Sequence, residues 1–214
     1  MGHDFTTSPS LAPLVFNTHE DMPAARTVFL IGSERSGTSA TAAVLDAIGV
    51  PIGESRDGHF ETTEFKLDLD HPGNRERLLA KIATLNSRHA RWGAQIWDDP
   101  GATVGLAAMV CNPCLVIVFR DLVAITQRRM SLPDESHTAK ETLDLRCEEM
   151  LRLLAHLTVV PVPTMLISFE RLRIQTTEVV SHIAEFLGVK PTPAQSQEAC
   201  DRVNLKGGYL IQTR

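Results

Sequence analysis

A long hydrophobic run is absent from this chain of 214 residues. No segment approaches the roughly 20 consecutive apolar residues that a helix needs to cross a bilayer. The first residues also lack a basic stretch followed by an apolar one, which is the pattern of a secretory signal peptide. We therefore expect a cytoplasmic protein with no transmembrane segment.

An excess of positive charge is also absent. The formal net charge is −5 and the sequence pI is about 5.9. A dedicated nucleic-acid-binding protein draws its affinity from a basic surface, so we expect no nucleic-acid partner. A local basic site for a small anionic ligand remains compatible with this composition.

Cysteine is scarce, with four residues in the chain. Cys111 and Cys114 have the spacing of a zinc-ligand pair, but no second pair follows them. A structural zinc site needs four ligands. We therefore expect reduced cysteines and no metal site.

Short apolar runs alternate with segments of helical periodicity. The predicted strands are 27–31, 92–97, 114–119 and 163–169, and the predicted helices are 38–48, 74–90, 102–110, 121–131, 143–154, 176–187 and 193–202. We expect Asn74 to cap the second helix, residues 98–101 to form a turn and Glu170 to end the last strand. Such alternation predicts an α/β protein whose central parallel sheet is flanked by helices in three layers. Residues 27–214 are expected to form a single domain, preceded by a flexible arm over 1–26.

A glycine-bounded turn follows the first predicted strand and opens the first helix. Gly32 and Gly37 are separated by four residues, as in the phosphate-binding P-loop pattern G-x-x-x-x-G-K-[ST]. Glycines let the backbone curl so that its N–H groups converge on an anion, and the helix N-terminus adds partial positive charge. The candidate anion-binding residues are Ser33, Arg35, Ser36, Gly37, Thr38 and Ser39. The pattern predicts a P-loop-like fold.

The lysine of that pattern is missing, because Thr38 occupies its position. This change handicaps a metal-assisted triphosphate site, in which the lysine reaches the terminal phosphates. It does not handicap a site for a phosphosulfate, because Arg35 inside the turn can lie beside the phosphate–sulfate bridge.

Several segments, in order, resemble the sulfotransferase family. Val28–Ser39 resembles its 5′-phosphosulfate loop, which in bacterial members reads near P-R-S-G-T-S. Leu115–Asp121 resembles the strand whose terminal arginine binds the 3′-phosphate of the donor. The remaining matches are 44–53, Gly58–Glu61 with Glu64, Ser168–Glu170 and Phe186–Gly188. The resemblance covers residues 27–189.

The resemblance implies a sulfotransferase that uses 3′-phosphoadenosine 5′-phosphosulfate (PAPS) and no metal. It places Arg35 at the transferred group and Arg120 at the 3′-phosphate. Arg128 stands where the family usually has a phosphate-binding serine. Glu61 is the first candidate for the general base, and His59 is the second. The acceptor would carry a hydroxyl or an amine on a small molecule, a glycan or a lipid, and a homodimer is compatible with the sequence.

Two departures from the family keep other interpretations open. Leu122 replaces a usual proline, and Trp92–Gly101 lacks both basic residues of the bacterial pattern W-G-W-K-D-P-R. One alternative is a P-loop nucleotide kinase or hydrolase, disfavoured by Thr38 and by Arg120, which separates the strand from Asp121. The other is a catalytically decayed relative that binds the nucleotide without turnover.

Overall fold

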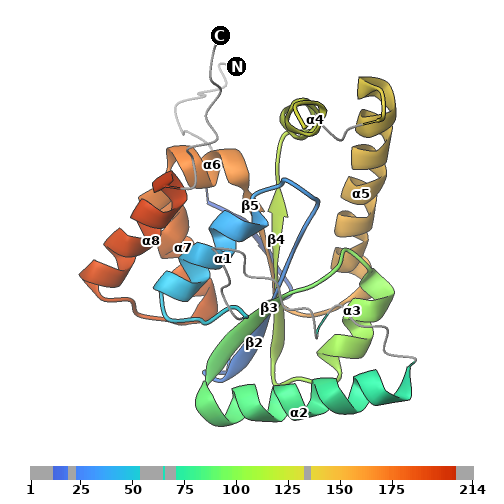
Figure 1. Ribbon diagram of the computed structural model, residues 1–214. Coiled ribbons are helices and arrows are strands. Elements are labelled where there is room, and N and C mark those ends of the chain that lie inside the picture. The colour runs from blue at the N-terminus through green and yellow to red at the C-terminus, as the bar shows by residue number, and fades with distance from the viewer. Residues whose placement is uncertain (1–11, 19–22, 54–64, 66–70, 133–135, 206–214) are drawn as a thin grey trace, which may run out of the picture.

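The computed structural model describes residues 12–18, 23–53, 65, 71–132 and 136–205 (Figure 1). Its centre is a five-stranded sheet in the order β1-β5-β4-β2-β3. The strands are β1 (Leu14–Phe16), β2 (Arg26–Gly32), β3 (Arg91–Gln95), β4 (Pro113–Phe119) and β5 (Thr164–Ser168). The last four run parallel, and β1 pairs with β5 in the antiparallel direction.

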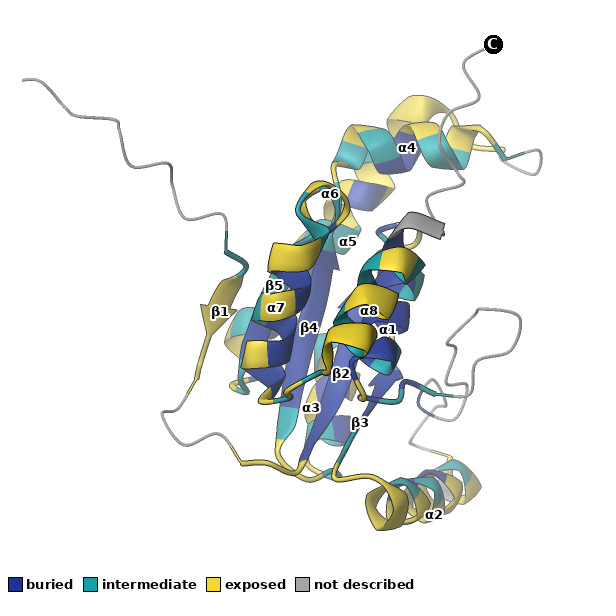
Figure 2. Ribbon diagram, turned by 90° about the vertical axis from the view of Figure 1, so that its left-hand side faces the viewer, coloured by how far each residue is buried: buried dark blue, intermediate teal, exposed yellow. Residues whose placement is uncertain are grey.

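Helices cover both faces of the sheet, which confirms the predicted three-layer α/β architecture. The helices are α1 (Thr38–Ala47), α2 (Pro72–Arg88), α3 (Pro100–Ala107), α4 (Leu122–Met130), α5 (Ala139–Val159), α6 (Phe169–Ile174), α7 (Thr176–Leu187) and α8 (Pro193–Leu205). One face packs against α1, α6, α7 and α8, and the other against α2, α3 and α5. Figure 2 shows β2 and β4 buried between these layers.

The two faces explain why the central strands are apolar without interruption. Val28 and Leu30 of β2 belong to one core, whereas Phe29 and Ile31 belong to the other. Successive side chains of a strand point to opposite faces, so a strand covered on both sides needs an apolar residue at every position.

Two predicted boundaries near α2 and α3 are wrong. The second helix begins at Pro72 after His71, so Asn74 lies inside its first turn rather than capping it. Proline is favoured at the first helical position because it has no N–H to satisfy and its φ angle is already helical. The expected turn at 98–101 is partly helical, because the Asp99 carboxylate accepts from the N–H groups of Gly101 and Ala102 and starts α3.

The end of β5 also differs from the prediction. Its last residue is Ser168, whose hydroxyl accepts from the N–H of Arg171 and begins α6. Glu170 therefore lies in the first turn of a helix that the apolar pattern did not reveal. The C-terminal helix was predicted over 193–202 and extends to Leu205.

Part of the N-terminal segment forms regular structure. Leu14, Val15 and Phe16 form β1 at the edge of the sheet, opposite Leu166, Met165 and Thr164 of β5. The sheet is consequently mixed rather than purely parallel. Over the described part of the chain, no helix combines the length and the apolar character needed to span a membrane.

Candidate functional site

The carboxyl ends of β2, β4 and β5 meet at one edge of the sheet, which is where ligands bind in open α/β folds (Figure 1). The turn after β2 and Arg120 after β4 are in direct contact there. The Arg120 Nη1 donates to the main-chain oxygen of Arg35 at 2.9 Å. The two segments that sequence reasoning singled out most strongly therefore lie together.

The turn between β2 and α1 is closed by its own main chain. The N–H of Ser36 donates to the carbonyl oxygen of Ser33 at 3.1 Å. Arg35 and Gly37 have φ angles of 65° and 104°. A left-handed conformation is unusual for a residue with a side chain, and such residues gather at functional sites.

The N-terminus of α1 is not capped by a side chain. Gly37 occupies the capping position without a side-chain hydrogen bond, and the first turn of the helix carries no acidic residue. The first N–H groups of a helix have no partner within it, and they carry the positive end of the helix dipole. Thr38 and Ser39 are the first two residues of this helix, so their N–H groups and hydroxyls lie at that positive end.

Both glycines of the turn are required by close packing. A Cβ atom on Gly37 would lie 2.2 Å from the Phe169 ring. On Gly32 it would lie 2.4 Å from the Ser36 Oγ and 3.0 Å from the Val118 carbonyl oxygen. These glycines set the shape of the turn because no other residue fits there.

A buried hydroxyl lies inside the turn. Ser36 is fully buried, and its Oγ has no hydrogen-bond partner among the described residues. Ser33 and Thr38 are also buried, and Thr38 Oγ1 accepts from the Gln95 side-chain amide at 3.4 Å. Burying a hydroxyl without a partner costs free energy, which a bound phosphate oxygen would recover.

Positive charge is concentrated around Arg120. Its guanidinium lies 5.2 Å from the centre of the Phe169 ring, and its Nε lies 3.9 Å from the Glu170 Oε1. Burial lowers the pKa of Arg120, Glu170 raises it, and the positive charges of Arg173 and Arg128 lower it further. An anion among these three arginines would relieve their mutual repulsion.

Glu170 fixes the geometry between β4 and β5. Its Oε1 accepts from the N–H of Asp121 at 3.1 Å, and its Oε2 accepts from the Ser168 hydroxyl at 3.2 Å. The carboxylate therefore holds the two strand ends together beneath Arg120. This is a structural role, which the sequence resemblance alone did not specify.

Helix α4 reaches the turn through Arg129. The Glu34 Oε1 lies 3.6 Å from the Arg129 Nη1 and 3.5 Å from the Arg35 Nε. Sequence reasoning had selected the neighbouring Arg128, whose Nη1 donates to the Ser131 hydroxyl at 3.4 Å and whose charge acts on Arg120. The sequence left open whether Arg128 or Arg129 faces the phosphate, whereas Arg173 was missed because it looks like an ordinary surface arginine of a helix.

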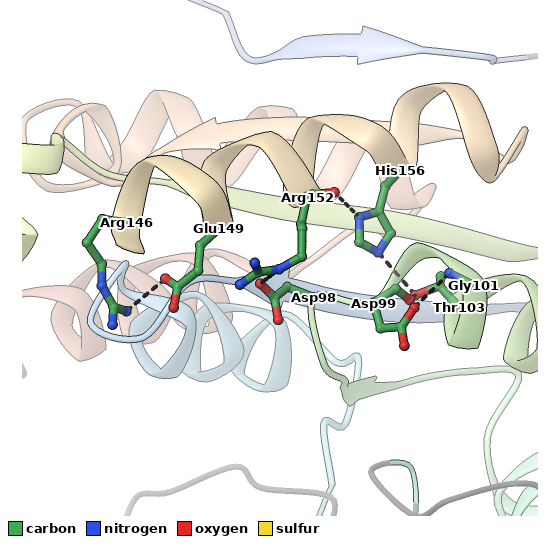
Figure 3. Close-up of polar contacts among 8 residues, drawn as sticks. All are labelled: Asp98, Asp99, Gly101, Thr103, Arg146, Glu149, Arg152 and His156. Carbon is green, nitrogen blue, oxygen red and sulfur yellow. Dashed lines mark hydrogen bonds and ion pairs between the residues drawn. The ribbon is translucent and has the colours of Figure 1, made fainter. Parts of the chain in front are cut away.

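The predicted bases, Glu61 and His59, lie outside the described residues and remain predictions. A charged cluster on α5 was missed altogether, in which Arg146 pairs with Glu149 and Arg152 pairs with Asp98 (Figure 3). Within the described part of the chain, no group of three or more metal-ligating side chains comes together.

No family model matches the sequence, and no curated protein does. Several solved structures are similar to this chain in fold. The sulfotransferase domain of the Synechococcus olefin synthase aligns with a TM-score of 0.54 and 16% identity, over 79% of this chain and 75% of that one. The sulfotransferase domain of the curacin biosynthetic pathway aligns with a TM-score of 0.55 and 16% identity, over 80% and 76%.

A mouse sulfotransferase complexed with PAP is similar as well. It aligns with a TM-score of 0.54 and 14% identity, and the chain spans 65% of its length. The chain therefore has the sulfotransferase fold, as the sequence resemblance implied.

Proposed function

We propose that this protein transfers a sulfuryl group from PAPS to a hydroxyl or an amine of an acceptor. The observation that carries the proposal is the hydrogen bond from Arg120 to the main chain of Arg35. It joins a glycine-bounded turn, suited to a 5′-phosphosulfate, to an arginine cluster suited to a 3′-phosphate. A ligand with two separate anionic groups fits this pair of sites.

The turn would hold the 5′-phosphosulfate. Its main-chain N–H groups, the free end of α1 and the buried hydroxyls of Ser33, Ser36 and Thr38 supply donors for phosphate and sulfate oxygens. Ser39, in the first turn of the same helix, contributes its N–H or its hydroxyl.

Arg120 and Arg128 would hold the 3′-phosphate, with Arg173 nearby. A guanidinium can bind a phosphate through two parallel hydrogen bonds. The mouse sulfotransferase of similar fold is complexed with PAP, which supports PAP as the ligand to test.

Sulfuryl transfer is an in-line displacement at sulfur. The acceptor atom forms a bond to sulfur, while the bond between sulfur and the bridging oxygen breaks. The electron pair of the broken bond stays on the leaving 3′-phosphoadenosine 5′-phosphate (PAP). Negative charge grows on that bridging oxygen, so the fixed N–H groups and the Arg35 guanidinium beside it would lower the barrier. A guanidinium is a poor proton donor, so this side chain would stabilise the charge without acting as an acid.

A titration with PAP tests the proposal. PAP at 100 times its dissociation constant should stabilise the folded protein by about 2.7 kcal/mol and raise its melting temperature. Arg35→Ala and Arg120→Ala should abolish the rise. Arg88→Ala, which removes an exposed arginine at the end of α2, is the matched control and should keep it.

An unchanged melting curve of the wild-type protein at millimolar PAP would contradict the proposal. A rise without consumption of PAPS in the presence of any acceptor would instead support the decayed, nucleotide-binding alternative. A rise that occurs with ATP and magnesium but not with PAP would favour the kinase or hydrolase.

A further inference from the structure

One face of α5 carries charged side chains at helical spacing. Arg146, Glu149, Arg152 and His156 are separated by three or four residues, so they lie along one side of the helix. Figure 3 shows this stripe pointing toward the segment that follows β3, where Asp98 and Asp99 lie. The stripe therefore borders the carboxyl edge of the sheet.

Glu149 is largely buried in this stripe. Its Oε2 accepts from the Arg146 Nη1 at 2.7 Å, and the two side chains are 14% and 6% exposed. Arg152 is engaged elsewhere, because its Nε donates to the Asp98 Oδ2 at 3.1 Å. The Glu149 Oε1 has no hydrogen-bond partner among the described residues, so it is free to accept a proton.

Charges on three neighbouring segments act on Glu149. Burial raises the pKa of its carboxyl, Arg146 lowers it, Asp98 raises it, Arg152 lowers it and Glu34 raises it. Glu34 is the immediate neighbour of Arg35 and also pairs with Arg129 of α4. Arg129 precedes Met130, whose sulfur accepts from the Thr142 hydroxyl of α5 at 3.7 Å, so α4 links the turn to the helix that carries Glu149. In Figure 3 the pale blue segment preceding α1 passes this part of α5.

We propose that Glu149 is the general base that removes the proton of the acceptor, with Arg146 as the residue that positions it. This inference rests on the proposed function and gives Glu149 the role for which the sequence resemblance offered Glu61 and His59. A base must be accessible, must keep a free oxygen and must lie beside the transferred group. The Glu149 side chain is 14% exposed, its Oε1 carries no hydrogen bond among the described residues, and α4 connects its helix to the turn.

The acceptor proton moves to Glu149 while the sulfuryl group is transferred. The O–H proton of a hydroxyl acceptor passes to the Glu149 Oε1 as the acceptor oxygen bonds to sulfur. The sulfur–bridging-oxygen bond breaks, and its electrons leave on PAP. Glu149 then releases the proton to water. Arg146 holds Oε2 throughout, so the carboxyl cannot rotate its free oxygen away.

The test compares two phenols as acceptors of the sulfuryl group from PAPS. Unsubstituted phenol must lose its proton during transfer, whereas para-nitrophenol can be supplied at a pH where it is already ionised. Glu149→Gln should slow transfer to phenol on the order of 10²–10⁴-fold, the usual contribution of a general base. Transfer to the ionised para-nitrophenol should change little.

Glu148→Gln is the matched control, because it makes the same substitution at the exposed neighbouring position. It should leave both rates unchanged, and both variants should keep the thermal shift with PAP. An equal loss with both phenols in Glu149→Gln, or no loss with phenol, would overturn the role of Glu149 alone. A wild-type protein that neither binds PAP nor uses either phenol would overturn the proposed function as well.

If the protein binds PAP but uses neither phenol, a pH titration of the Glu149 carboxyl tests the proposal instead. Glutamate labelled with carbon-13 at the carboxyl would report the Glu149 signal, assigned by its loss in Glu149→Gln. Titration above the ordinary glutamate range, with a shift when PAP binds, would support the role. Titration at or below that range would overturn it.

Discussion

The two sides of the candidate site are built in different ways. The turn from Gly32 to Thr38 is made of main chain, two closely packed glycines and short hydroxyl side chains. The stripe on α5 is made of ionisable side chains that pair with one another and with Asp98 after β3. One side offers fixed dipoles in a rigid frame, and the other offers groups that gain and lose protons. Transfer chemistry needs both, since the leaving group requires fixed positive charge and the acceptor requires a base.

The largest effect on stability is expected from Gly37→Ala, a substitution in the rigid turn. The new Cβ would lie 2.2 Å from the Phe169 ring, and alanine would have to keep a φ angle of 104°. We expect a loss of more than about 2 kcal/mol of stability and of the thermal shift with PAP. Chemical denaturation with and without PAP measures both.

Gly73→Ala is the control for that prediction. A Cβ at this position has its nearest neighbours at 3.8 Å, and the residue lies in the first turn of α2. Alanine favours helices, so this variant should be neutral or slightly more stable. If Gly37→Ala behaves like Gly73→Ala, the turn is not the rigid element described above.

Ser36→Ala should separate folding from binding. The buried Oγ has no partner among the described residues, so its removal should leave the ligand-free protein as stable or about 1 kcal/mol more stable. PAP binding should weaken about tenfold, because a hydrogen bond to the ligand is lost. Calorimetry and denaturation of the same sample test this, and unchanged PAP affinity would remove Ser36 from the site.

The C-terminal end of the α5 stripe, where His156 lies, should make the free energy of unfolding depend on pH. His156 is fully buried, with Nδ1 3.1 Å from the Arg152 oxygen and Nε2 3.1 Å from the Thr103 Oγ1. Burial lowers the pKa of His156 below 6.5, against smaller opposing effects from hydrogen bonds to the main chain and from Asp98 and Asp99.

The unfolded chain therefore binds this proton more readily than the folded one. Stability should fall as pH drops from about 6.5 toward the lower folded pKa, by at most about 1.4 kcal/mol per pH unit from this group. His156→Leu should remove that part of the slope, whereas His89→Gln, at an exposed position, should keep it. Denaturation midpoints across this pH range measure the effect. The same slope of stability against pH in His156→Leu as in the wild-type protein would contradict the prediction.

The smallest effect on stability is expected from a substitution of Glu34 in the turn. Glu34 pairs with Arg35 and Arg129, but its side chain is 48% exposed. Exposed ion pairs contribute between about 0 and 1 kcal/mol, so Glu34→Gln should change stability by no more than that. It should lower the pKa of Glu149 by removing a like charge, which the acid limb of the pH–rate profile would report. If the acid limb of the profile does not shift in Glu34→Gln, the charge of Glu34 does not act on Glu149.

The turn could be predicted because its residues are contiguous and their pattern carries its own geometry. The same holds for α7, which the sequence placed over Thr176–Leu187 and which ends where Gly188 adopts a left-handed conformation. In both places glycine marks a backbone shape that few other residues adopt.

Elements that depend on distant partners could not be predicted in the same way. Strand β1 has three residues and exists through its pairing with β5, about 150 positions away along the chain. Helix α6 begins where the Ser168 cap outweighs the strand preference of the preceding apolar run. The α5 stripe resembles any charged helix face until the order of the strands brings it to Asp98.

The comparison of PAP with adenosine 5′-monophosphate, which lacks the 3′-phosphate, tests the central claim most directly. Calorimetry on the wild-type protein should show a clear preference for PAP. Arg120→Ala should reduce that preference about 10- to 100-fold, as expected for hydrogen bonds between charged groups. Equal affinity of the wild-type protein for both nucleotides, or a preference that survives Arg120→Ala, would contradict the account.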